Sequence, residues 1–155
     1  MTDSSHILTV EITSFSYKRP LPANLFSNTE EKHGGGFVFD CRCLPNPGRE
    51  EQYKSQTGLD LDVITYLQQA KEVETFQTHT FALINAAIEN YMHRNFSFLS
   101  VAFGCTGGQH RSVYFTEQLS RYLLKSYSPR VATSVFHSNL DSTGKPLEPN
   151  KPPLH

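Results

Sequence analysis

The stretch Phe98-Leu-Ser-Val-Ala-Phe-Gly-Cys-Thr-Gly-Gly-Gln-His-Arg-Ser112 carries more chemistry than any other part of this 155-residue sequence. Its first half alternates large apolar residues with Ser100 and Ala102, a pattern typical of a strand that buries at least one face. The glycine-rich run 104–108 then permits positive φ angles, and helical spacing begins after Gly108. The stretch therefore predicts a strand, a tight turn and a helix in direct succession.

A strand, a glycine-rich turn and a helix N-terminus together favour anion binding. Successive backbone N–H groups point into such a turn, and the helix dipole adds roughly +0.5 charge at its start. Arg111 adds a planar guanidinium, while Thr106 and Ser112 add hydroxyl donors. The Lys-Ser/Thr pair of a nucleotide-hydrolysing loop is missing. The candidate phosphate-binding residues are Cys105, Thr106, Gly107, Gly108, His110, Arg111 and Ser112. A merely structural turn is the alternative.

Cys105 and Arg111 also match the Cys-x5-Arg-Ser spacing of cysteine-dependent phosphatases. In such enzymes the thiolate attacks phosphorus while the loop amides and the arginine hold the phosphate oxygens. Phosphatase chemistry also needs an acid that protonates the leaving oxygen, and no neighbouring residue is identified for that task. The simpler interpretation is that Cys105 is a small apolar residue at the end of a buried strand.

The composition indicates a single domain and excludes several classes of protein. No apolar run approaches the ~20 residues that span a bilayer, and the N-terminus lacks a signal-peptide pattern, so a cytoplasmic protein without a membrane partner is expected. Fourteen basic against fifteen acidic residues give a net charge of −1, so any RNA contact requires a local basic patch. Three cysteines and scattered histidines predict reduced thiols and neither a metal nor another cofactor.

Periodicity places strands and helices alternately along the chain. Strands are expected over 6–17, 37–44, 98–105 and 131–136, and helices over 60–70, 74–94 and 110–126, the first capped by Asp60. The second strand is expected to turn its Phe37, Phe39, Cys41 and Cys43 face to the core. The buried stripes are expected to be Phe76, Thr80, Leu83, Ala87 and Tyr91 in the long helix, with Ile84 and Ile88 beside them, and Val113, Thr116, Leu119, Leu123 and Tyr127 in the last.

These elements predict an α/β domain over residues 1–141, with a mostly parallel sheet of about four strands and helices packed on its faces. Residues 23–36 are expected to form a mobile loop, and the Pro-rich residues 142–155 a flexible tail. In parallel sheets, ligands gather beyond the carboxyl ends of the strands. The residues expected there, as a pocket or an RNA-binding surface, are Lys18, Arg19, Asp40, Arg42, Asn46 and His137.

Four segments resemble the C-terminal domain of the RapZ family of RNase adapter proteins. They are Ser14-Phe-Ser-Tyr-Lys18, Val38-Phe-Asp-Cys-Arg-Cys-Leu-Pro-Asn-Pro47, Thr57-Gly-Leu-Asp60 and Gly104-Cys-Thr-Gly-Gly-Gln-His-Arg-Ser-Val113. The resemblance covers about residues 8–141. It implies a fold like a sugar-phosphate kinase subdomain, and an adapter that binds small regulatory RNA, presents it to an endoribonuclease and senses glucosamine-6-phosphate.

Larger members of this family carry an additional N-terminal P-loop domain, so a stand-alone C-terminal domain is expected here and the nucleotide binding of that other domain is not transferred. Two departures concern the RNA function. The family's final His-Arg-Asp-Leu stands here as His137-Ser-Asn-Leu140, and residues 28–36 read as an acidic, glycine-rich insertion. The ligand pocket is therefore expected to be better preserved than the RNA surface.

The sequence thus favours a non-catalytic domain that binds a phosphorylated ligand. Its expected partners are an amino-sugar phosphate, small RNA and an endoribonuclease, and association with a second copy of the chain is left open. The alternative is a cysteine-dependent phosphatase that uses Cys105 and Arg111.

Overall fold

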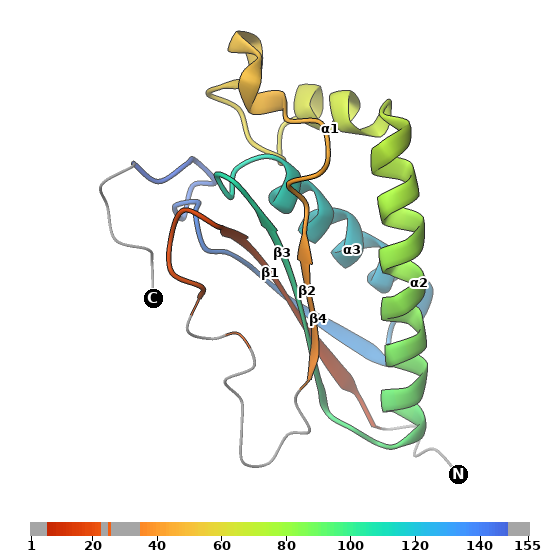
Figure 1. Ribbon diagram of the computed structural model, residues 1–155. Helices are drawn as coiled ribbons and strands as arrows, with labels where there is room; N and C mark the ends of the chain where they lie inside the picture. Colours follow the sequence, from red (N-terminus) through yellow and green to blue (C-terminus); the bar gives the residue numbers. More distant parts are fainter. Residues whose placement is uncertain (1–5, 23–24, 26–34, 149–155) are drawn as a thin grey trace.

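The computed structural model describes residues 6–22, 25 and 35–148 (Figure 1). The predicted mobile loop over 23–36 and the predicted insertion over 28–36 lie almost wholly outside the described residues. The strands are β1 (Leu8–Ser16), β2 (Gly36–Asp40), β3 (Phe98–Cys105) and β4 (Val131–His137). The helices are α1 (Leu61–Gln68), α2 (Lys71–His93) and α3 (Arg111–Tyr127), with short 3-10 turns at Pro47–Arg49 and Glu51–Tyr53. Within the described residues, no helix combines the length and apolar character needed to cross a bilayer.

The four strands form one sheet in the order β2-β3-β1-β4, and every neighbouring pair is parallel. The α/β prediction with a parallel four-stranded sheet is therefore confirmed. The register pairs Ser16 with Cys105, Asp40 with Gly104 and Ser14 with His137. Because all strands run the same way, their carboxyl ends meet at one edge of the sheet, as the sequence predicted.

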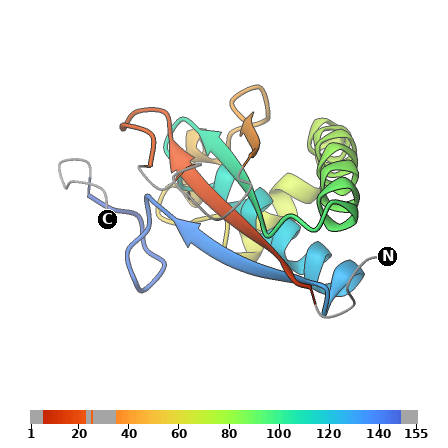
Figure 2. The same cartoon turned by 90° about the horizontal axis from the view of Figure 1, so that it is seen from below.

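The hydrophobic core lies between the helices and one face of the sheet. Every second residue of β1 from Leu8 to Ile12 is fully buried, and these side chains pack with residues of α2 and α3 such as Ile84 and Leu119. Figure 2 shows α2 and α3 on the same side of the sheet. All five predicted core positions of α3 are buried, as expected from their helical spacing.

The predicted stripe of the long helix is partly wrong. Helix α2 begins three residues earlier than predicted, and Leu83, assigned to the core, is 53% exposed. The core face carries Val73, Phe81 and Met92 together with the predicted Thr80, Ile84 and Ile88. Apolar residues occupy two adjacent faces of this helix, so periodicity alone allowed either face. Packing against the sheet selected the face with the isoleucines.

Two further expectations are corrected near the start of the domain. Strand β2 ends at Asp40, because the chain turns between Cys41 and Leu44, and this turn leaves Cys43 exposed while Cys41 is buried. Asp60 precedes α1 but makes no side-chain cap bond. Its carboxylate instead accepts a hydrogen bond from the Thr57 amide at 2.7 Å, and so it stabilises the preceding turn.

The described part of the Pro-rich segment folds back onto the domain. Leu140 forms an isolated bridge with Pro146, and the Leu147 amide donates to the carbonyl oxygen of Asn139 at 3.0 Å. Arg19 donates to the carbonyl oxygen of Glu148. Residues 149–155 lie outside the described part of the chain, so the flexible tail remains a prediction there.

Candidate anion-binding site

The glycine-rich loop joins β3 to α3 at the centre of the carboxyl edge of the sheet (Figure 1). Gly108 has a φ of +63°, and a Cβ there would lie 2.9 Å from the backbone nitrogen of Ser16. Only glycine adopts this conformation beside another backbone without strain. A Cβ on Gly107 would meet no heavy atom within 4 Å. The loop is thus tightly seated at Gly108 and open at Gly107.

The carbonyl groups of the loop accept hydrogen bonds, whereas its amide groups donate none within the described residues. Ser16 Oγ donates to the Thr106 carbonyl at 2.7 Å, and Asn139 Nδ2 donates to the Gly107 carbonyl. The carbonyl of Gln109 accepts from the Gly58 amide at 2.9 Å. Within the part of the chain that the structure describes, the backbone N–H groups of residues 106–113 donate to no acceptor. Free amides at a helix N-terminus are the donor set that phosphate groups bind.

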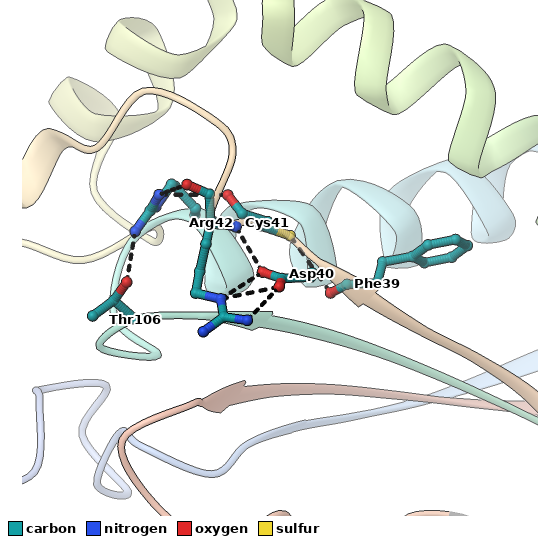
Figure 3. A network of polar contacts seen from close by, with 6 residues as sticks. Phe39, Asp40, Cys41, Arg42 and Thr106 are labelled. Atoms are coloured by element: carbon teal, nitrogen blue, oxygen red, sulfur yellow. Dashed lines mark hydrogen bonds and ion pairs between the residues drawn. The ribbon is translucent and has the colours of Figure 1, made fainter.

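Arg111 is buried, and its guanidinium contacts both the loop and the segment after β2. Its side-chain Nη1 donates to the carbonyl oxygens of Arg42 and Leu44, both at 3.0 Å, and its Nη2 lies 3.4 Å from Thr106 Oγ1. Figure 3 shows the chain after β2 approaching Thr106 in this network. The sequence predicted that this guanidinium would hold phosphate directly. In the structure it connects the segment after β2 to the loop, and its charge lies beside the anion site.

Cys105 and Ser112 form the floor of the site. The Cys105 thiol is within 3.1 Å of Ser112 Oγ, to which it donates, and these residues are only 2% and 0% exposed. A nucleophilic cysteine needs an accessible thiolate in an electropositive surrounding. Burial of this thiol therefore favours the packing role that the sequence offered as the simpler interpretation.

One rim of the site is formed by Tyr17, Asp40 and Arg42. Arg42 Nη2 forms an ion pair with Asp40 Oδ2 at 2.6 Å, and its guanidinium lies 4.0 Å from the centre of the Tyr17 ring. The hydrogen bond from Arg42 lowers the pKa of the Asp40 carboxyl. Lys18 lies next in the chain with an exposed side chain, whereas Arg19 contacts the segment at Glu148. Lys18 and Arg42 are therefore the accessible cations of this rim.

The opposite rim is formed by His110 and the turns after β2. His110 Nε2 lies 2.8 Å from the Tyr53 carbonyl oxygen, and burial lowers the pKa of its imidazole. Asn46 Oδ1 accepts from the Gly48 amide at 3.0 Å, and an added Cβ on Gly48 would lie 3.3 Å from the His110 ring. Asn46 thus shapes the turn that packs against His110.

His137 was predicted at the pocket but lies beneath α3. Its Nδ1 is 2.7 Å from Ser14 Oγ and its Nε2 is 2.7 Å from Glu117 Oε1, so both ring nitrogens are occupied. The hydrogen bond from His137 lowers the pKa of the Glu117 carboxyl. The loop contact comes instead from Asn139 and Ser16, which sequence reasoning did not select. Both lie within segments that the sequence had singled out, since they flank His137 and Lys18.

In the described residues, no three His, Cys, Asp or Glu side chains gather where they would hold a metal ion.

Comparisons with known proteins identify the family of this domain. The model of the RapZ C-terminal domain family matches residues 8–141. A nucleotide-binding protein of Paracidovorax citrulli is 38% identical over 134 residues, which cover 86% of this chain and 41% of the relative. A nucleotide-binding protein of Xanthomonas oryzae is 36% identical over 89% of this chain and 45% of its own length. This chain thus spans less than half of these curated relatives. The match over nearly all of the described fold shows that the chain belongs to the RapZ C-terminal domain family.

Proposed function

We propose that this domain binds a phosphate-bearing ligand on the 106–113 loop without transforming it. The observation that carries this proposal is the run of backbone amides that donate to no described acceptor at the start of α3. Their dipoles and that of the helix favour an anion at this place. The buried charge of Arg111 and the exposed cations Lys18 and Arg42 act in the same direction.

Within this class, we propose an amino-sugar phosphate such as glucosamine-6-phosphate as the small ligand. Membership of the RapZ C-terminal domain family supports this choice, as does the opening at Gly107. The loop amides bind the phosphate, and the Asp40 carboxylate on the rim accepts a hydrogen bond from the ammonium group. The relatives are named nucleotide-binding proteins, but this chain spans less than half of their length, so their names do not assign that ligand to this loop.

Calorimetric titration with glucosamine-6-phosphate, glucosamine and inorganic phosphate tests this proposal. We expect binding of the first, weaker binding of phosphate and none of glucosamine. Gly107→Ala places a methyl group in the opening of the loop, so it should weaken binding while thermal unfolding stays at the wild-type temperature. Failure of every phosphorylated ligand to bind the folded wild type would refute the proposal.

For RNA, we propose that the rim cations Lys18 and Arg42 contact backbone phosphates and that the domain serves as an adapter for an endoribonuclease. Each phosphate neutralised on single-stranded RNA contributes about −0.7 to the slope of log affinity against log salt. Replacing both cations by alanine should therefore reduce the slope by about 1.4. Low-salt affinity no higher than that of an inert acidic protein would remove RNA from the proposal.

The Cys-x5-Arg spacing and the Cys105–Ser112 hydrogen bond keep a phosphatase as the second candidate. Turnover of an aryl phosphate, measured for wild type and Cys105→Ser, separates the two functions. We expect no turnover, because the thiol is buried. Sustained hydrolysis that disappears in Cys105→Ser would assign the domain to the phosphatases.

A further inference from the structure

A cavity lies between α2 and α3, the helix into which the anion loop leads. Figures 1 and 2 show these two helices side by side. The groove between them has a volume of about 480 Å³, which is within the range of small-molecule sites. Its walls include Gln77, Phe81, Asn85, Tyr114, Gln118 and Tyr122.

Tyr114 gives this groove a phenol hydroxyl that a ligand can reach. The residue is only 3% exposed, and burial raises the pKa of its phenol. In the described part of the chain, its hydroxyl has no hydrogen-bond partner. Tyr114 lines the groove, so a molecule bound there can exchange a hydrogen bond with this hydroxyl.

One side of the remaining wall is aromatic, and the other carries side-chain amides. Asn85 Nδ2 donates to the Tyr122 hydroxyl at 2.7 Å, and the ring of Tyr122 packs on Phe81 with centroids 5.3 Å apart. This side presents an aromatic surface. Gln77 and Gln118 contribute side-chain amides, which both donate and accept hydrogen bonds. Hydroxyl groups have the same dual capacity, so this donor and acceptor set suits a polyhydroxylated molecule.

The groove and the anion loop differ in charge, so they favour different kinds of ligand. None of the described residues that line it is a lysine, arginine or histidine, and Glu74 contributes a carboxylate. The Glu74 carboxylate, with no cation among these lining residues, disfavours an anion there. From the cavity, the unpartnered phenol and this charge distribution, we infer that the α2–α3 groove binds an unphosphorylated pyranose sugar, with its C–H face on the aromatic wall and its hydroxyls on Tyr114 and the glutamines.

NMR titration of the full chain tests this site with methyl α-D-glucopyranoside, N-acetylglucosamine and glucose 6-phosphate. Tyr114→Phe removes the hydroxyl while the ring remains, so the fold is retained. Tyr66→Phe is the matched control, because Tyr66 is half-buried and lies outside this groove. We expect the neutral sugars to shift groove amides, and we expect Tyr114→Phe to weaken the affinity about tenfold, the effect of one lost hydrogen bond. Tyr66→Phe should bind as wild type.

Three results would overturn the inference. They are the absence of groove shifts with either neutral sugar, equal affinity of wild type and Tyr114→Phe, and equally strong groove shifts with glucose 6-phosphate. Because the loop residues report separately in the same spectra, loss of phosphate binding at residues 106–113 leaves the groove result interpretable by itself.

Discussion

Replacing Arg111 by alanine removes a buried guanidinium that connects two distant segments. Two of its hydrogen bonds, to the carbonyls of Arg42 and Leu44, have good length at 3.0 Å. A hydrogen bond to a charged group contributes about 1.5–3 kcal/mol, so the pair contributes about 3–6 kcal/mol. The buried Arg111 Nε has no partner in the described residues, and its removal offsets part of this loss. We expect the free energy of unfolding to fall by about 2–4 kcal/mol.

Urea denaturation monitored by circular dichroism measures this change, and the slope of the unfolding free energy against urea concentration should be the same for wild type and variant. For a chain of this size the melting temperature should fall by roughly 10 °C. Arg111→Lys retains the charge but lacks the planar fork, so it should lie between wild type and alanine. Arg42→Ala removes an exposed guanidinium and should unfold close to wild type. A loss below about 1 kcal/mol in ligand-free Arg111→Ala, together with abolished phosphate binding, would refute the supporting role and restore a direct ligand contact.

Three other predictions follow from the loop. Gly108→Ala should lower the free energy of unfolding by about 2 kcal/mol, because residue 108 has a left-handed backbone conformation. Gly107→Ala should have a free energy of unfolding within about 0.5 kcal/mol of the wild-type value. Equal denaturation midpoints for the two variants would contradict this. The pKa of His110 is lowered in the folded state, so the free energy of unfolding should be highest above about pH 6.5 and fall as the pH drops below that value. His110→Gln removes this titration and should make the melting temperature less dependent on pH between about 7.5 and 5.5. Parallel curves of melting temperature against pH for wild type and variant would argue against this role of His110. Asn139→Ala should lower the NMR order parameters of the loop amides because Gly107 loses its tether, and unchanged order parameters would rule this tether out.

Local sequence determined the elements and the parallel sheet. The five predicted stripe positions of α3 are buried, because helical spacing decides which residues share a face, whereas the core residues Tyr114 and Phe115 lie outside that stripe and were not predicted. The strand–turn–helix order around Gly108 was likewise predictable, since glycine chemistry and apolar alternation act over a few residues. The placement of Ser16, Asp40 and Cys105 at one edge followed from the alternation of strands and helices.

Only the tertiary structure decided which partner each polar side chain meets. Arg111 donates hydrogen bonds to carbonyls 67 and 69 residues away, and His137 is hydrogen-bonded to Ser14 and Glu117, which spacing along the chain does not indicate. The exposure of Leu83 likewise depended on which of two apolar faces packs on the sheet. Residue type and spacing specify what a side chain can bind, whereas strand register and helix rotation, set by long-range packing, specify what lies within its reach.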